Sequence, residues 1–426
     1  MPTVLSLGGT GQFGLPTARH LAADPVVERV IVAGRDLVKA EAAAATLGPK
    51  GVARQVDADD DASLAAAMEG VSVVVSTLWE AEGRAARVAR AAVAAGAHYV
   101  ELNDDAPDAD LDAAARRAGV ALLRRVGASP GMTDLCVRHA LEGLDEPQVL
   151  VTMRHWPRLL DFWTDLFDNY ADLPGGRRRG PLGRHLTATL TAGERDPATV
   201  AAVLRDACVA PFFLVLIGDP GRWLATVPDL RAGEIVDVDA LVEGFDVSAL
   251  VGAPHRERPL VATEPPAQSD GVRRVSVTAT GMGAAFDDAV RAGARRVAAG
   301  GALDAEVAAL EEAIARDPLT FLRPASEVAA LPAAAFVALG RRGGVPARAS
   351  VVLPDELFVP DRYLDLTAAA VAVTVRYLLD GTVEARGAAT MADAVRDAER
   401  FGHDYLALFG PEVAGLDLYA RRVVPA

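Results

Sequence analysis

The sequence contains very little cysteine. Its two cysteines, Cys136 and Cys208, lie far apart in a chain of 426 residues, and neither belongs to a C-x-x-C pair. Neither a disulfide framework nor a structural zinc site is therefore indicated, and no metal site is expected.

Lysine is almost as rare, since only Lys39 and Lys50 occur and arginine carries nearly all of the positive charge. A mechanism that needs a catalytic lysine has only these two candidates. Acidic residues outnumber basic ones by 58 to 43, which gives a formal net charge of −15. Nucleic acid is excluded as a partner because phosphate binding requires a basic face.

Long apolar runs are also missing. The longest, at about residues 207–217, is shorter than the roughly 20 residues that cross a bilayer. The N-terminus has neither the basic region nor the apolar region of a signal peptide. We therefore expect a cytoplasmic protein without a membrane partner. With 51% hydrophobic and 24% charged residues, the chain is of ordinary globular composition, and its length favours two or three domains.

The first part of the chain alternates short apolar segments with helical ones, which is typical of a parallel sheet covered by helices on both faces. The pattern predicts an α/β fold with a Rossmann, doubly wound parallel sheet over residues 1–128. Strands are expected at residues 3–7, 30–33, 52–56, 71–76, 99–102 and 120–126.

The character of the sequence changes after Pro147. Short β-like segments at residues 272–280, 334–339 and 347–353 and a helix at 304–315 predict an α+β second domain. We place this substrate-binding and dimerisation domain, with a mainly antiparallel sheet, at residues 129–358. Residues 359–426, with helices at 363–379 and 392–401, are expected to return towards the Rossmann domain as a helical segment.

A glycine motif follows the first predicted strand and begins the first helix, the context in which it indicates dinucleotide binding. Gly9 allows a tight turn, Gly11 lets the backbone approach a pyrophosphate, and Gly14 lets helix and strand pack closely. Thr10, Gln12 and Phe13 complete the loop. The alternative is a glycine-rich turn without a ligand.

The end of the second strand bears on the choice of cofactor. NAD enzymes carry an acid there that binds the ribose 2′-hydroxyl, but this sequence has Arg35, which favours NADP and leaves NAD open. Alternatively, Arg35 is solvated and Asp36 binds the ribose. Asp57, which ends the third strand, is expected beside the adenine, or else it caps the following helix.

About 140 N-terminal residues resemble the saccharopine dehydrogenase family in the segments GGTGQFG, AGRDLVKAE, VDADDDASL, VVVST, AAVAAGAHYVELND and AARRAGVALLRRVGASPGMTD. The resemblance implies a Rossmann domain, a β-rich substrate domain through which the chain forms a homodimer, and a cleft between them. It also implies hydride transfer at a carbon–nitrogen bond, by imine reduction or amine oxidation, on a small amino-acid-like substrate.

The sequence departs from the family where proton transfer is expected. The loop after the fourth strand, where members commonly carry a proline and a histidine, reads LWEAE from Leu78 to Glu82. Ser129 replaces the usual aspartate before Pro-Gly. The best-known NAD-dependent members use a lysine and a histidine, and no lysine follows Lys50. The resemblance therefore implies the chemistry but not saccharopine as the substrate.

Ligands of doubly wound folds bind beyond the carboxyl ends of the strands. Thr77, Leu78, Asn103 and Asp104 are therefore expected around the nicotinamide and its ribose. Glu80 is the preferred general acid or base, with Glu82 as the fallback; a surface glutamate is the alternative.

Further candidates lie nearer the second domain. Asp134 lies in the last segment expected around the nicotinamide and is a candidate catalytic residue. His155 is a candidate proton donor, and Arg154, beside Trp156, a candidate clamp for a substrate carboxylate. For Arg154 and His155 the alternative is that they are ordinary strand residues of the second domain.

Two other functions remain open at this point: an enoyl reductase-like enzyme that acts in trans on a lipid intermediate, and a non-catalytic NADP-binding sensor. An apolar channel in the second domain favours the first. Cofactor binding without turnover favours the second.

Overall fold

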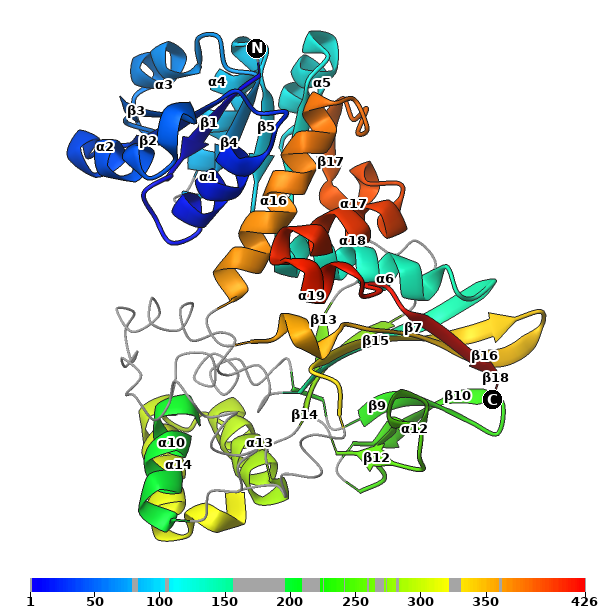
Figure 1. Cartoon of the computed structure of the whole chain (residues 1–426). Coiled ribbons are helices and arrows are strands. Elements are labelled where there is room, and N and C mark those ends of the chain that lie inside the picture. The colour runs from blue at the N-terminus through cyan, green and yellow to red at the C-terminus, as the bar shows by residue number, and fades with distance from the viewer. Residues whose placement is uncertain are drawn as a thin grey trace. The chain divides into compact units, whose positions relative to one another are not determined.

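The computed structural model (Figure 1) describes residues 2–78, 83–103, 107–155, 196–208, 223–224, 226–240, 242–258, 260–264, 272, 274–280, 283–321, 331–359 and 362–425. The chain divides into two compact units. Unit 1 comprises Met1–Leu135 and Leu364–Leu416, and unit 2 comprises Cys136–Tyr363 and Asp417–Ala426.

Unit 1 contains a seven-stranded parallel sheet in the order β17-β6-β5-β4-β1-β2-β3. Read from β3, the first six strands have the order 3-2-1-4-5-6 of a Rossmann domain. The predicted fold class is therefore confirmed. The strands are β1 Thr3–Leu7, β2 Arg29–Gly34, β3 Gly51–Gln55, β4 Val73–Ser76, β5 His98–Glu101, β6 Ala121–Arg124 and β17 Gly387–Thr390.

Short, alanine-rich helices alternate with these strands. Aspartates cap three of them, since Asp36, Asp60 and Asp108 accept hydrogen bonds from backbone N–H groups at the helix starts. The helices are α1 Gly14–Ala23, α2 Leu37–Ala45, α3 Asp61–Met68, α4 Arg84–Ala94 and α5 Ala109–Ala118.

The C-terminal part of unit 1 contributes a strand as well as helices, which corrects the expectation of a purely helical segment. β17 pairs with β6 in parallel. Ala388 donates its N–H to Asp112 of α5 at 2.6 Å, and this bond, with one from Arg116, lowers the pKa of Asp112. Gly387 has a φ of +82°, and an added Cβ would lie 2.4 Å from Asp112 Oδ1. Only glycine therefore fits where the strand begins.

The predicted helix at residues 392–401 is wrong, because two helices occupy this part of the chain. α17 spans Met391–Ala394 and α18 spans Ala398–Leu406. Thr390 and Asp393 form a capping box at the first, and Asp397 accepts from Arg400 N–H at the second. The caps separate the helices. The helix predicted at residues 363–379 matches α16, Tyr363–Leu379, which is buried along almost its whole length.

Unit 2 contains a second seven-stranded sheet in the order β18-β16-β15-β7-β14-β13-β8. Every pair is antiparallel except β7 with β14, so the expectation of a mainly antiparallel sheet is confirmed. The strands are β7 Glu146–His155, β8 Trp223–Leu224, β13 Leu260–Glu264, β14 Arg274–Thr280, β15 Ala334–Arg342, β16 Val345–Val352 and β18 Arg421–Pro425.

A separate hairpin packs on this sheet. β9, Thr226–Arg231, pairs with β10, Glu234–Asp239. Hydrophobic residues of the hairpin, among them Val227 and Val238, form one buried cluster with residues of β7 and β15. Unit 2 also contains the helices α10 Pro197–Cys208, α13 Ala284–Ala298 and α14 Leu303–Arg316 and the short strands β11 Phe245–Asp246 and β12 Arg256–Glu257.

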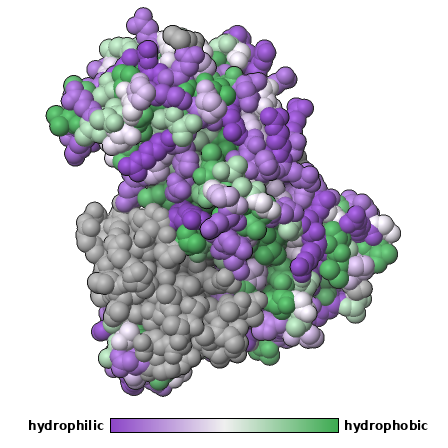
Figure 2. Space-filling model, in the orientation of Figure 1, coloured by the Kyte–Doolittle hydropathy of each residue, from purple (hydrophilic) through white to green (hydrophobic). Residues whose placement is uncertain are grey.

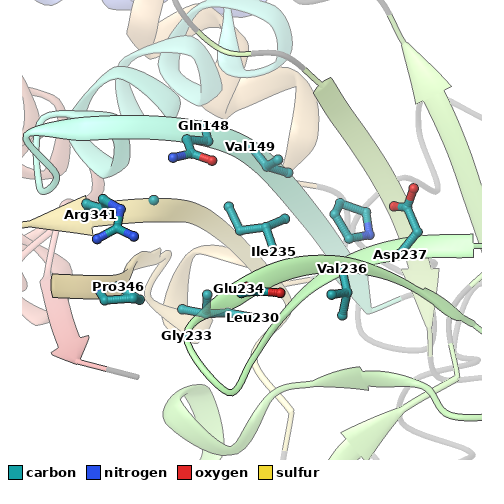
Figure 3. A pocket seen from close by; sticks show the side chains of 12 residues that line it. Gln148, Val149, Leu230, Gly233, Glu234, Ile235, Val236, Asp237, Arg341 and Pro346 are labelled. Carbon is teal, nitrogen blue, oxygen red and sulfur yellow. The ribbon is translucent and has the colours of Figure 1, made fainter.

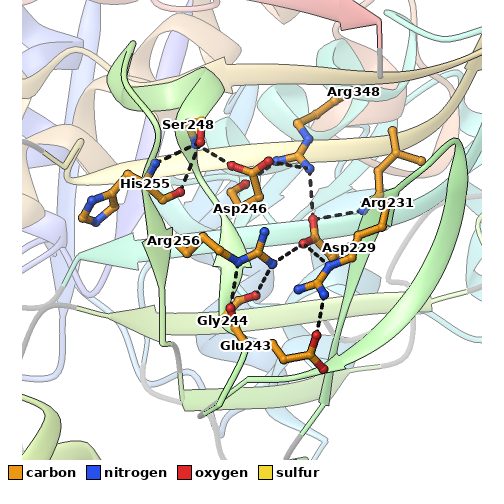
Figure 4. A network of polar contacts seen from close by, with 10 residues as sticks. Asp229, Arg231, Glu243, Gly244, Asp246, Ser248, His255, Arg256 and Arg348 are labelled. Carbon is orange, nitrogen blue, oxygen red and sulfur yellow. Dashed lines mark hydrogen bonds and ion pairs between the residues drawn. The ribbon is translucent and has the colours of Figure 1, made fainter.

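A network of ion pairs connects β9 to its neighbours (Figure 4). The side chain of Asp229 is fully buried and binds Arg348 of β16 at 3.0 Å and Arg256 of β12 at 2.6 Å. Arg231 lies 3.5 Å from the same carboxylate and also pairs with Glu243. Three strands of unit 2 are thus joined through one aspartate.

No helix of the described part of the chain is long and apolar enough to cross a bilayer. Hydrophilic side chains cover most of the face of unit 1 that is visible in Figure 2.

Candidate dinucleotide site

The carboxyl ends of four neighbouring strands in unit 1 lie in one row. Leu7 of β1 pairs with Ala33 of β2 and with Ser76 of β4, and Ser76 pairs with Glu101 of β5. The residues that follow these four therefore leave the sheet at one edge, where doubly wound folds bind their ligands.

The glycine loop after β1 is fixed by close backbone contacts. Gly8 has a φ of +75°, and Gly11 N–H donates to Gly8 O at 2.8 Å. A Cβ at Gly14 would lie 2.0 Å from Gly8 O, and one at Gly9 would lie 2.9 Å from Ser6 O. Glycine is therefore required for the fold of this loop at both positions.

Gly11 is in a different environment. It is exposed, and the only atom within 4 Å of an added Cβ is Gly8 O at 3.1 Å. The space in front of its Cα is open, as close approach to a phosphate requires. Thr10, half-buried, and Gln12, exposed, flank it.

The start of α1 suits an anion. Phe13 occupies the N-cap position without a side-chain cap, and the first turn contains no acidic residue. Backbone N–H groups and the positive end of the helix dipole attract phosphate at such a position. The loop and helix together fit the pyrophosphate of a dinucleotide.

Arg35 lies at the same edge, directly after β2. Gln55 donates to its backbone oxygen at 3.0 Å, while its exposed guanidinium has no hydrogen bond or ion pair within the described residues. Asp36 caps α2 by accepting from Lys39 N–H at 3.1 Å. The guanidinium is thus available to a 2′-phosphate.

The loop after β3 contains two aspartates, of which Asp59 interacts electrostatically with Arg35. Asp57 is exposed and accepts from Asp59 N–H at 3.0 Å. Since Asp60 caps α3, the alternative role of Asp57 as that cap is wrong. The pKa of Asp59 is lowered, mainly by its hydrogen bonds from Arg84.

The nicotinamide side is bounded by the loops after β4 and β5. Thr77 is half-buried and donates its hydroxyl to Leu7 O at 3.0 Å, and Leu78 packs against the core of unit 1. Asn103 O accepts from Arg125 N–H at 2.8 Å. These residues lie at the predicted edge of the sheet.

Asp134 is held by an ion pair. Arg125 donates Nε and Nη2 to its two oxygens at 2.8 and 3.0 Å, and Gly131 N–H donates to it at 3.3 Å. Both charged side chains are largely buried, with exposed fractions of 13% and 15%. This geometry fixes the turn after β6. The catalytic role of Asp134 stays a prediction.

The remaining candidates fall in two groups. Arg154 and His155 end β7 in unit 2, where Arg154 is half-buried and His155 is buried. Glu80, Glu82, Asp104 and Trp156 lie outside the described residues.

Two charged residues near this edge were not predicted from the sequence. Arg125 has a φ of +57°, donates its backbone N–H to Asn103 O and forms the ion pair with Asp134. Glu101 is buried at the end of β5, and Tyr99 donates its hydroxyl to it at 3.1 Å. A glutamate in an apolar strand was the available signal for Glu101. No local pattern pointed to Arg125.

We expect Gly11→Ala to weaken NADP binding at least tenfold, about 1.4 kcal/mol, because the added methyl group occupies the space in front of the loop. The melting temperature should change little, since the new Cβ has one close neighbour. Gly14→Ala, by contrast, should lose both stability and binding. Calorimetric titration measures the affinity, and wild-type affinity in Gly11→Ala would show that this loop is not the phosphate site.

We expect NADP to bind more tightly than NAD, and Arg35→Ala to remove most of the difference, since the variant loses a charge-assisted contact with the 2′-phosphate. Dissociation constants for both dinucleotides measure the preference. Arg29→Ala is the matched control, because Arg29 is also exposed but begins β2, at the opposite edge of the sheet. Equal affinities in the unmodified protein would contradict the assignment.

Comparison with known proteins identifies a cofactor-binding domain in unit 1. Residues 4–123 match the family model of the saccharopine dehydrogenase NADP binding domain, which confirms the expected resemblance and the expected NADP cofactor. Apo saccharopine dehydrogenase (L-Glu forming) from Saccharomyces cerevisiae matches over 100% of both chains at 14% identity, with a TM-score of 0.56. Serine dehydrogenase from Escherichia coli matches 29% of this chain and 80% of its own at 13% identity, with a TM-score of 0.25.

Proposed function

We propose that this chain, whose residues 4–123 match the saccharopine dehydrogenase NADP binding domain, is an oxidoreductase that transfers a hydride at a carbon–nitrogen bond of an amino-acid-derived substrate. Imine reduction and amine oxidation are the two directions of this reaction. The proposal includes a cytoplasmic homodimer, whose mass light scattering can measure.

One observation carries the proposal. The glycine loop and the acid-free start of α1 lie in one row with Arg35 and with the loops after β4 and β5. An anionic dinucleotide that binds along this row has its 2′-phosphate at Arg35 and its other end near Thr77 and Asn103. This is the arrangement in which doubly wound folds hold a cofactor for redox chemistry.

In the proposed mechanism, the dinucleotide would, when bound, supply a hydride as NADPH for imine reduction or accept one as NADP⁺ for amine oxidation. The chain binds and orients the cofactor through the glycine loop and Arg35. The substrate nitrogen must gain or lose a proton, and we assign this transfer to Glu80. Arg154 is proposed to hold a substrate carboxylate, because its guanidinium makes no ion pair within the described part of unit 2.

The test is NADPH oxidation, followed by absorbance, with amino acids paired in turn with a panel of aldehydes and 2-oxo acids. Turnover that requires both an amine and a carbonyl compound supports the proposal. NADP binding without turnover would make the protein a sensor, and turnover only with enoyl lipids would make it an enoyl reductase. Either result would overturn the proposed reaction.

A further inference from the structure

Opposite charges are arranged differently in the two units. In unit 2, a cavity of about 490 Å³ lies between the β9–β10 hairpin and the strands β7, β15 and β16, with Arg341 at one end and Asp237 at the other (Figure 3). In unit 1, at the edge of the sheet where the dinucleotide is expected, an arginine and an aspartate are in direct contact. This contact lies in the neighbourhood of Arg35, which is proposed to bind the 2′-phosphate of NADP.

Asp59 is held at this edge by the start of α4. Arg84 donates Nε and Nη2 to the two carboxylate oxygens of Asp59, at 3.1 and 3.0 Å. Arg87 donates Nη1 to the backbone oxygen of Asp59 at 2.5 Å. A fork of two parallel N–H···O bonds fixes the orientation of both side chains. The carboxylate therefore has a defined position, although 57% of the side chain is exposed.

The loop that carries Asp59 is a neighbour of Arg35. Gly34 pairs with Gln55 in the parallel ladder of β2 and β3, and Gln55 donates its side-chain amide to Arg35 O at 3.0 Å. The residues after β3 therefore leave the sheet next to the residues after β2. The pKa of the Asp59 carboxyl is lowered mainly by its hydrogen bonds from Arg84, and the charge of Arg35 also contributes.

A 2′-phosphate at Arg35 is therefore exposed to the field of this ion pair. A phosphate monoester carries a charge of about −1.5 to −2 at pH 7. The carboxylate of Asp59 repels such a group, while the guanidinium of Arg84 attracts it. NAD has an uncharged hydroxyl group at the same position. The ion pair can therefore act on the affinity for NADP without acting on the affinity for NAD.

We propose that Asp59 and Arg84 are specificity-determining residues, of which Asp59 lowers and Arg84 raises the affinity for NADP relative to NAD. Arg35 makes the contact with the 2′-phosphate, and the ion pair sets how strongly the phosphate is held. The proposal rests on the proposed function, because it requires NADP to bind with its 2′-phosphate at Arg35.

The test is calorimetric titration of the full chain with NADP and with NAD at about 0.1 M salt. Asp59→Asn removes the negative charge and keeps the shape of the side chain, so we expect NADP to bind at least about threefold more tightly. Arg84→Met removes the positive charge and keeps an apolar stem, so we expect NADP to bind at least about threefold more weakly. The affinity for NAD should change by less than about twofold in both variants, because NAD has no charge at this position.

Glu69→Gln is the matched control, because it changes the net charge by the same amount as Asp59→Asn. Glu69 is exposed and follows the last residue of α3. At 1.5 Å per residue, it lies about 12 Å along this helix from Asp61, which exceeds the screening length of about 10 Å at this salt concentration. The control should bind both dinucleotides like the unmodified protein.

Thermal unfolding of each variant confirms that it folds. The proposal fails if Asp59→Asn does not tighten NADP binding or if Arg84→Met does not weaken it. It also fails if either variant changes both affinities by the same factor, which is the result expected of an ion pair that only fixes the loop. These results leave the proposed function intact. Equal affinities for NADP and NAD in the unmodified protein would overturn the assignment of Arg35 and this proposal with it.

Discussion

Replacing Asp229 with alanine is expected to lower the free energy of unfolding of unit 2 by about 3–5 kcal/mol, the usual cost of removing one partner of a buried ion pair. Asp229 is fully buried, and the Arg348 that it binds has a side chain only 9% exposed. The variant leaves the Arg348 guanidinium with only the more distant carboxylate of Asp246, at 3.8 Å, and it also removes the ion pair of Arg256. Urea unfolding followed by circular dichroism measures the loss, with separate transitions fitted if the two units unfold independently.

Glu243→Ala is the control for this prediction. Glu243 pairs with Arg231 in the same network, but its side chain is 44% exposed, and exposed pairs contribute about 0–1 kcal/mol. Adding Arg348→Met to Asp229→Ala should recover part of the loss, because the stranded charge is removed. If Asp229→Ala and Glu243→Ala lower the free energy of unfolding by the same amount, burial of the Asp229 ion pairs does not stabilise unit 2.

The Rossmann sheet was predictable from the sequence because its signals are local. β1 and α16 were predicted with their observed bounds, since a short apolar run before a glycine motif and a long apolar helix need no partner to be identified. β17 was not predicted, because the four residues Gly387–Thr390 are a strand only through pairing with β6 and the contact with Asp112.

Unit 2 shows the same limit more clearly. β7 lies at the centre of its sheet, but it begins with Glu146 and Pro147 and contains a bulge. The alternation of apolar and polar residues that identifies a strand is therefore broken in its sequence. In unit 1, the single helix expected at residues 392–401 was wrong for a different reason: Thr390 and Asp397 each cap a helix start, so two short helices form instead of one.

For the candidate site, the glycine motif predicted the loop because Gly9 and Gly14 are required by backbone contacts within a few residues, while Gly11 leaves open space in front of the loop. Arg35 was identified by its position after a strand. The contacts of Asp134 with Arg125 were not predictable, since they depend on the φ of +57° at Arg125 and on the turn after β6. Features that depend on neighbouring residues, such as the glycine loop and the position of Arg35, were predictable. Contacts that form only once the turn after β6 has folded were not.

Replacing Glu80 with glutamine is expected to lower turnover at least tenfold, because general acid–base catalysis contributes about 10²–10⁴-fold. The proposed reaction requires a proton at the substrate nitrogen. The only lysines precede residue 51, and the loop after β4 contains no histidine. Glutamine has nearly the shape of glutamate but does not titrate. The variant should therefore keep its NADP affinity and lose one limb of the pH–rate profile.

Two variants make this prediction specific. Glu82→Gln changes the same loop and should keep turnover within about twofold, because we assign the proton transfer to Glu80 alone. His155→Ala removes the candidate at the end of β7, and it should leave the pH–rate profile unchanged in shape. Steady-state rates of NADPH oxidation from acidic to basic pH measure all three variants. Full turnover in Glu80→Gln together with its loss in His155→Ala would place the proton donor in unit 2 and overturn the assignment to the loop after β4.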